Sequence, residues 1–189
     1  RIYVQEKVYD IFAEKLSVAV SKMVVGDGFS SDSTLGPLIT PDALKKVEEH
    51  ISDAVKKGAK INCGGNKHSL GGTFFEPTVL TNVDKSMLIT NEETFGPVAP
   101  LFKFKNEEDV IQQANDTIFG LASYFYASDL SRVWRVAEAL EYGMVGINTG
   151  LISTEVAPFG GIKQSGIGRE GSHHGIDEYL ELKYLCFSI

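Results

Sequence analysis

Residues 106–148 read NEEDVIQQANDTIFGLASYFYASDLSRVWRVAEALEYGMVGIN, and they alternate helix-forming with strand-forming segments. Asn106 can cap the first helical segment, and Ser128 or Asp129 can cap the second, because short polar side chains accept hydrogen bonds from the unpaired amides of a first turn. The intervening segments ASYFYA and MVGIN are rich in the branched and aromatic residues that suit strands. This alternation predicts an α/β fold with a largely parallel sheet.

The same alternation continues toward the amino end. Apolar residues recur at three- and four-residue intervals from Val8 to Met23, which predicts an amphipathic helix after the strand-like opening RIYVQ. A second helix is expected from Thr40, because a hydroxyl cap followed by Pro41 is a favourable start, and Gly58 supplies its stop. The strand-like segments KINC, FFEPTVL and VAPLFKF follow. We therefore expect a three-layer α/β arrangement.

The carboxyl end differs from the rest of the chain. Residues 178–187, EYLELKYLCF, alternate apolar and polar side chains, which predicts a strand in which Cys186 is a small packed side chain. This strand has no evident partner in its own sheet, and an exposed edge invites pairing with another chain. We take residues 169–189 as an oligomerisation arm of a homo-oligomer, either a dimer or a tetramer.

Composition excludes several classes of protein. The chain has 189 residues, 43% hydrophobic and 23% charged, with a net charge of −7 and no basic stripe, which argues against nucleic acid as a partner. No apolar run approaches the roughly 20 residues that a bilayer requires, so we expect no membrane partner. Two distant cysteines, Cys63 and Cys186, are too few for a disulfide framework. A reducing compartment is expected, either the cytoplasm or, in a eukaryote, the mitochondrial matrix.

One glycine-rich segment matches a cofactor motif only superficially. Gly166 to Gly171 spell G-x-G-x-x-G, the pattern of a dinucleotide-binding loop. That loop requires a preceding strand, a following helix and a βαβ unit of about 30 residues or more. Only residues 172–189 follow, and Gly, Lys, Gln and Ser precede the motif. We predict instead a tight backbone path that needs small residues and positive φ.

No nucleophile or metal site is evident within the chain. Cys63 precedes two glycines and has His68 nearby, but no orienting carboxylate or oxyanion hole accompanies it. His173 and His174 lack a third ligand at helical spacing. We therefore predict no catalytic residue and no metal ligand among these 189 residues.

The segment TNEETFGPVAP contains the most informative polar residues. Glu92 and Glu93 precede Phe95, and Gly96-Pro97 forces a bend between two apolar segments. A carboxylate held in such a bend can accept hydrogen bonds from both hydroxyls of a sugar diol, while the aromatic ring packs on a flat ring. The alternative is a solvated acidic turn, and the residue types alone leave both interpretations open.

Five motifs together carry a resemblance to a known family. GPLIT, EETFGPV, FGLASYFYASD, GMVGIN and PFGGIKQSGIGREG resemble the carboxyl-terminal part of the NAD(P)-dependent aldehyde dehydrogenases, in order and over the whole chain. GLIS before PFGG, and the ending GIDEYLELKYLC, are similar to the succinate-semialdehyde dehydrogenases within that family. The resemblance implies that residues 1–168 are the second half of the catalytic domain and residues 169–189 its oligomerisation arm.

The resemblance also implies roles for four residues. Glu93 would bind the hydroxyls of the nicotinamide ribose of NAD or NADP, and Phe95 would pack beside that ribose and ring. Phe159 would line the aldehyde tunnel, and Ser153 would donate a hydrogen bond to the distal carboxylate of the substrate. A hydroxyl alone does not compensate a buried anion, so an arginine from elsewhere in the protein is expected. The alternative for Ser153 is a loop hydroxyl bonded to its own backbone.

Family members place the nucleophilic cysteine just before an equivalent of RIYVQ, and the general-base glutamate also lies upstream. We therefore expect both residues upstream of Arg1, and we expect the chain alone to be inactive. The implied reaction of the full-length enzyme is NAD(P)-dependent oxidation of succinate semialdehyde to succinate, in 4-aminobutyrate degradation. Two alternatives are a dehydrogenase for another semialdehyde, such as glutarate semialdehyde, and a free-standing, non-catalytic oligomerisation or binding module.

Overall fold

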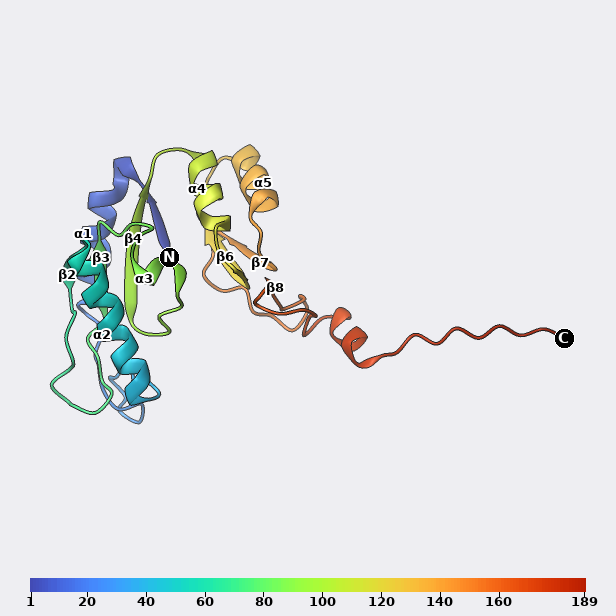
Figure 1. The fold of residues 1–189 in the computed structure, drawn as a ribbon, viewed down its shortest axis with the longest axis horizontal. Coiled ribbons are helices and arrows are strands. Elements are labelled where there is room, and N and C mark those ends of the chain that lie inside the picture. The colour runs from blue at the N-terminus through green and yellow to red at the C-terminus, as the bar shows by residue number, and fades with distance from the viewer. The chain divides into compact units, whose positions relative to one another are not determined.

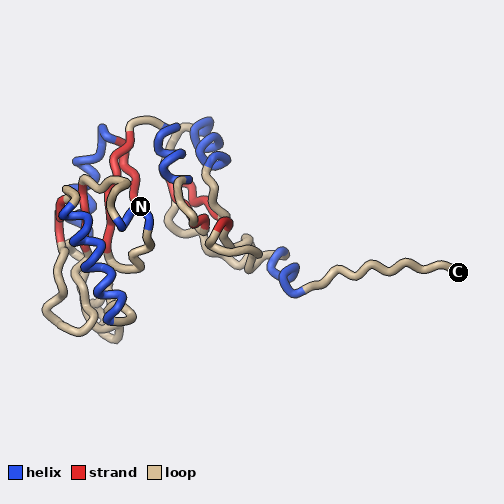
Figure 2. Tube along the Cα trace, in the orientation of Figure 1, coloured by secondary structure: helices blue, strands red, loops and turns tan.

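The chain, described here by a computed structural model of residues 1–189, divides into two compact units. The first unit comprises residues 1–106 and the second comprises residues 107–189. Figure 1 labels most of the helices and strands of the two units, and Figure 2 colours the chain by type of secondary structure.

The first unit is built on a four-stranded sheet in the order β1-β4-β3-β2. Strand β1 (Ile2–Gln5) runs parallel to β4 (Val98–Phe104), and β4 runs parallel to β3 (Thr78–Thr81). Strand β2 (Lys60–Cys63) is antiparallel to β3. The strands predicted at RIYVQ, KINC and VAPLFKF are confirmed, whereas FFEPTVL contributes only its last residues.

The helices of the first unit also follow the sequence signals. After the short 3-10 turn η1 (Glu6–Val8), helix α1 spans Tyr9–Val20. Helix α2 spans Pro41–Lys56, and its predicted cap is confirmed because the Thr40 hydroxyl accepts a hydrogen bond from the Ala43 amide at 3.1 Å. A one-turn helix, α3, spans Leu88–Asn91.

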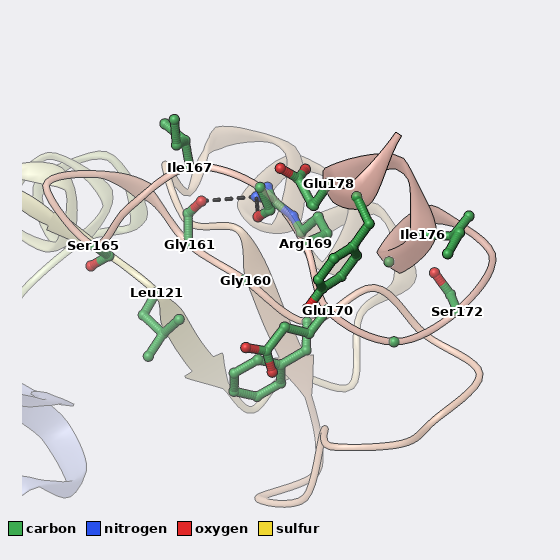
Figure 3. Close-up of a pocket in the computed structure, with 15 residues that line it drawn as sticks. Leu121, Gly160, Gly161, Ser165, Ile167, Arg169, Glu170, Ser172, Ile176 and Glu178 are labelled. Atoms are coloured by element: carbon green, nitrogen blue, oxygen red, sulfur yellow. Dashed lines mark hydrogen bonds between the residues drawn. The ribbon is translucent and has the colours of Figure 1, made fainter. Parts of the chain in front are cut away.

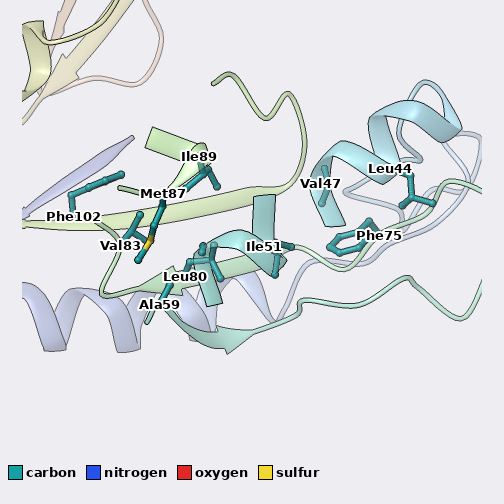
Figure 4. Close-up of a cluster of buried hydrophobic side chains, with 11 residues drawn as sticks. Leu44, Val47, Ile51, Ala59, Phe75, Leu80, Val83, Met87, Ile89 and Phe102 are labelled. Carbon is teal, nitrogen blue, oxygen red and sulfur yellow. The ribbon is translucent and has the colours of Figure 1, made fainter. Parts of the chain in front are cut away.

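The sheet of the first unit separates two helical layers. Val79 and Leu101 are buried against α1, whereas their chain neighbours Leu80 and Phe102 belong to the cluster on the α2 side, shown in Figure 4. This arrangement follows from the period of two in a strand, which sends successive side chains to opposite faces. Fully burying a side chain of this size contributes about 1.5–3 kcal/mol. The predicted three layers are thus present in this unit.

The second unit contains two small sheets. Strand β6 (Ala122–Phe125) runs parallel to β7 (Met144–Ile147), and β5 (Phe119–Gly120) pairs antiparallel with β8 (Ile162–Lys163). The expectation of one largely parallel sheet is therefore corrected to a mixed and only partly parallel arrangement. The physical reason is that the separate strand pairs are only two to four residues long, and no strand bridges them into one sheet.

Two helices accompany these strands, α4 (Glu107–Asn115) and α5 (Leu130–Ala139). The predicted cap of α5 is confirmed, because Asp129 accepts a hydrogen bond from the Arg132 amide at 2.7 Å. Glu107 bonds both Arg132 and Arg135 of α5, at 2.9 and 3.0 Å, and hydrogen bonds from Arg135 and then Arg132 lower the pKa of this carboxyl group.

The core of the second unit is thin. Among its apolar side chains only Val136 is buried, and Trp134 of α5 is 63% exposed. Large apolar side chains left in contact with water are typical of surfaces that another chain segment or subunit covers.

The predicted terminal strand does not form within the chain. After the 3-10 helix η2 (His174–Tyr179), residues 180–189 are an unpaired loop (Figure 2). The expectation that Cys186 is packed is wrong for this chain, because its side chain is exposed. The physical reason is that a strand requires a neighbour for its backbone amides and carbonyls. Pairing with another chain stays a prediction.

None of the helices combines the length and the apolar character that a membrane span requires.

Candidate functional site

The segment between α3 and β4, residues 92–97, presents alternate side chains in opposite directions. The hydroxyl of Thr94 and the carboxylate of Glu92 both contact α2. Glu93 is exposed and makes no hydrogen bond or ion pair with the rest of the chain, and Phe95 is 80% exposed. The predicted pair, Glu93 and Phe95, is therefore available to a ligand, whereas their neighbours are engaged with the fold.

Helix α2 holds the start of this segment. Asp53 accepts a hydrogen bond from the amide of Leu88, the first residue of α3, at 2.8 Å. Lys57 contacts Asp53 at 2.8 Å and donates to the carbonyl of Ser86 at 2.6 Å. The hydrogen bond from Lys57, supplemented by the Leu88 amide, lowers the pKa of the Asp53 carboxyl group. These contacts fix α3 against α2.

The same helix holds the turn itself. His50 is 1% exposed; its Nδ1 lies 2.9 Å from the Thr94 hydroxyl and its Nε2 lies 3.4 Å from a carboxylate oxygen of Glu92. Lys46, one turn earlier on α2, lies 3.7 Å from the same oxygen. Positions three or four apart share one face of a helix, so a single face of α2 serves the whole segment.

The bend is closely packed at its far end. A Cβ added to Gly96 would lie 2.5 Å from Cγ2 of Val47, a residue of α2 that is fully buried. Phe95, immediately before it, has a φ of +39°, which an L-residue rarely adopts. Such a conformation persists where surrounding contacts over-determine it, and the contacts with α2 supply that constraint here.

Phe159, which the family resemblance places in the wall of the aldehyde tunnel, lies beside an open hollow of about 830 Å³ in the second unit. Its backbone exchanges two hydrogen bonds with Glu170, at 2.8 and 2.7 Å. Arg169 also lines the hollow, and its Nη1 donates to the carbonyls of Gly161 and Gly168 at 2.9 and 2.8 Å, the first of which Figure 3 shows as a dashed line. Phe159 is thus held by the glycine-rich segment that follows it.

That glycine-rich segment has the tight backbone that the sequence predicts. Gly168 has a φ of +86°, and a Cβ added there would lie 2.7 Å from the carboxyl carbon of Glu178. The segment leads into the short 3-10 helix η2 rather than the α-helix of a phosphate-binding loop. Gly166, Gly168 and Gly171 all have positive φ, so these glycines serve the backbone path of the segment.

Ser153 lies elsewhere in the second unit. It is exposed in the loop between β7 and β8, and it is not among the residues that line the hollow beside Phe159. Its hydroxyl makes no hydrogen bond within the chain, whereas Thr149 of the same loop does bond its own backbone, at 3.2 Å to the Leu151 amide. The hollow beside Phe159 therefore does not include Ser153, and a substrate site shared by the two residues stays a prediction.

The cysteines and paired histidines take ordinary positions. Cys63 is partly buried and packs against the apolar cluster beside α1, and no His or Lys bonds it. The rings of His173 and His174 lie 3.9 Å apart, and His174 contacts Asp177 at 3.7 Å. The chain has no group of three or more His, Cys, Asp or Glu side chains that could hold a metal ion.

The exposed carboxylate and aromatic ring at residues 92–97 belong to a fold that comparison identifies. A family model described as the aldehyde dehydrogenase family matches residues 1–185. The chain belongs to the aldehyde dehydrogenase family. Aldehyde dehydrogenases are oxidoreductases that act on aldehydes.

Aldehyde dehydrogenases of known specificity resemble the chain along its full length. It is 65% identical to the succinate-semialdehyde dehydrogenase (NADP+) of Escherichia coli over 189 residues, and 66% identical to the glutarate-semialdehyde dehydrogenase of Pseudomonas aeruginosa over 186 residues. These matches cover 100% and 98% of the chain. The crystal structure of succinate-semialdehyde dehydrogenase from Burkholderia pseudomallei matches 100% of the chain with a TM-score of 0.97 and 64% identity.

The chain spans 39% of the Escherichia coli and Burkholderia proteins and 38% of the Pseudomonas protein. The activity of a whole aldehyde dehydrogenase is therefore a proposal for this chain.

Sequence reasoning missed the contribution of α2. His50 falls on the apolar stripe of that helix between Val47 and Ile51, and all three side chains are buried. A histidine on an otherwise apolar face was a usable signal, because a buried ring nitrogen requires a hydrogen-bond partner. The sequence does not reveal that the partner lies 44 residues away at Thr94.

Proposed function

We propose that this chain is the carboxyl-terminal portion of an NAD(P)-dependent semialdehyde dehydrogenase that oxidises succinate semialdehyde to succinate, as in 4-aminobutyrate degradation. The observation that carries the proposal is the outward-facing pair Glu93 and Phe95 on a turn held by α2. Membership of the aldehyde dehydrogenase family supplies the reaction class, and the Escherichia coli relative supplies the substrate.

The residues at the turn fit a nicotinamide ribose. The two oxygens of Glu93 can accept from the two ribose hydroxyls without breaking an existing bond, because this carboxylate has no partner in the chain. The exposed ring of Phe95 gains favourable free energy by packing on the ribose and nicotinamide. When bound, NAD or NADP would accept a hydride from the aldehyde carbon. The task of Glu93 is to hold the cofactor in an orientation where that transfer is possible.

For the substrate we assign Phe159 to the apolar wall and Ser153 to the distal carboxylate. The hydroxyl of Ser153 is exposed and unbonded, so it is free to donate. The loop that contains Ser153, residues 149–159, has no cationic side chain, and Glu155 has the wrong sign. We therefore assign the cation to another part of the full-length protein.

We also assign the nucleophilic cysteine and the general-base glutamate to the remaining length of the protein. Cys63 has no neighbouring base, and Cys186 lies in the unpaired tail. Residues 169–189 form the oligomerisation arm of a homodimer or homotetramer in this proposal. The exposed apolar side chains of that arm, among them Leu182 and Tyr184, support an intermolecular role.

The substrate assignment is tested by Ser153→Ala in the full-length enzyme. Loss of a hydrogen bond to a charged group costs about 1.5–3 kcal/mol, or roughly tenfold to a hundredfold. We expect kcat/KM to fall by that factor for succinate semialdehyde and to stay unchanged for a neutral aldehyde of similar length. Thr154→Ala, the adjacent exposed hydroxyl, is the matched control. Equal losses on both substrates would reject the role of Ser153.

Glutarate semialdehyde is the second candidate substrate, favoured by 66% identity to the Pseudomonas aeruginosa enzyme. The two semialdehydes differ by one methylene, for which a pocket discriminates about tenfold to 200-fold. A higher kcat/KM for the five-carbon substrate would assign the protein to glutarate semialdehyde. The third alternative is a free-standing oligomerisation or binding module. An intact-mass measurement of the natural protein at 20.6 kDa would favour that alternative.

A further inference from the structure

The 92–97 turn contains two carboxylates, and only Glu93 faces outward. Glu92 bonds back to α2, where His50 is the one buried residue that contacts two side chains of the turn. Resting on the cofactor role proposed for Glu93, we propose that His50 is a positioning residue that sets the orientation of Glu93 by holding Thr94 and Glu92 on either side of it.

The hydrogen-bond chemistry at His50 is directional. A carboxylate only accepts, so a hydrogen bond between His50 and Glu92 requires a proton on Nε2; in that tautomer Nδ1 accepts from the Thr94 hydroxyl. Residues 92 and 94 are thereby fixed on the α2 side. In an extended backbone successive side chains point in opposite directions, and Glu92 has extended φ and ψ angles of −106° and 139°. Fixing Glu92 and Thr94 inward directs Glu93 outward.

The two contacts differ in strength. The Thr94 contact is 2.9 Å, a normal hydrogen-bond length, whereas the Glu92 contact is 3.4 Å. Glu92 is also 51% exposed and shared with Lys46 at 3.7 Å. Exposed ion pairs of this kind contribute little. The bond to Thr94 is therefore the main restraint, and loss of Glu92 is expected to matter less.

Other contacts of α2 with this segment do not substitute for His50. Asp53 binds the first residue of α3, at the opposite end of that helix from the turn. Val47 packs against Gly96, beyond Phe95. Neither of these two contacts involves a residue adjacent to Glu93. His50 alone bonds the residues on both sides of that carboxylate.

The test uses the full-length enzyme and single-turnover hydride transfer. Misplacement of a reacting group by about 1 Å costs on the order of a hundredfold. We expect His50→Ala to slow hydride transfer at least tenfold, Thr94→Val to do the same, and Glu92→Gln to slow it less than threefold. His50→Asn, whose amide oxygen can occupy the place of Nδ1 and accept from the Thr94 hydroxyl, should restore most of the rate. Thr94→Val also removes the restraint without emptying the site that His50 fills.

Combining variants separates positioning from simple packing. If His50 acts through Glu93, then His50→Ala combined with Glu93→Gln is no slower than Glu93→Gln alone; additive losses would overturn the inference. Should Glu93→Gln leave hydride transfer unchanged, the cofactor role of the turn fails. If Glu93→Gln is slow while His50→Ala and Thr94→Val both transfer hydride at the wild-type rate, only the positioning role fails.

Discussion

Replacing Glu93 by Gln removes one acceptor oxygen and the negative charge while keeping the size of the side chain. Hydrogen bonds to a charged acceptor contribute about 1.5–3 kcal/mol, against about 0.5–1.5 kcal/mol for neutral pairs. The substitution would therefore weaken the two hydrogen bonds from the ribose hydroxyls by about 2–3 kcal/mol in total. Glu93 is exposed, so water already satisfies its carboxylate before the cofactor binds. The net loss in cofactor affinity should consequently be less than tenfold.

The rate of hydride transfer should fall by a larger factor than the affinity for the cofactor, because a loosely held nicotinamide spends less time in reacting geometry. We expect about a hundredfold slower single-turnover reduction of the cofactor, with a larger isotope effect when the aldehyde hydrogen is deuterium. Stopped-flow absorbance of the reduced nicotinamide measures this rate. Glu49→Gln is the matched control, because Glu49 is an exposed carboxylate of α2 without a hydrogen bond. An unchanged hydride step in Glu93→Gln would refute the reasoning.

Three further predictions concern the support of the turn and the tail. Gly96→Ala should lower the free energy of unfolding by about 1–3 kcal/mol, because the added methyl group overpacks against Val47, and it should raise the KM for the cofactor. Adding Val47→Ala should reverse part of both effects. A Gly96→Ala variant with unchanged stability and KM would contradict the close packing. Folding lowers the pKa of the Asp53 carboxyl group from its ordinary value of 3.8. The ionised carboxylate therefore stabilises the folded chain above that pH, and this stabilisation is lost as the pH falls through the lowered pKa of the folded state. Amide exchange at Leu88 should accelerate in that acidic window in the wild type but not in Asp53→Asn, and identical pH profiles would refute the link. Deleting residues 180–189 should yield a smaller oligomer by mass photometry, and an unchanged mass would remove the arm from the interface.

Much of the first unit could be predicted because its signals are local. The cap at Thr40 and the strand VAPLFKF depend on residue types within a few positions, and both are as predicted. The second unit was predicted less well. Its strands are so short that their grouping into separate pairs depends on contacts such as Phe119 with Lys163, which no local pattern reveals.

The candidate site was also predicted only in part, because some of its features depend on residues that are distant in the sequence. Residue types alone drew attention to Glu92, Glu93 and Phe95 at a bend, and only the family resemblance favoured Glu93 over Glu92. The structure finds Glu93 and Phe95 exposed, and their role toward a cofactor stays a prediction. The sequence could not show that Glu92 faces the other way, since the two adjacent glutamates are identical in type. Their difference arises from His50, which is distant in the sequence and adjacent in the fold. The roles of Ser153 and Phe159 stay predictions.

The most direct test of the central claim is a crystal structure of the full-length enzyme with NAD or NADP bound. The account predicts a carboxylate oxygen of Glu93 within about 3.2 Å of a hydroxyl of the nicotinamide ribose, with the ring of Phe95 against the same sugar. A cofactor bound with its nicotinamide ribose away from residues 92–97, and Glu93 still facing solvent, would contradict it.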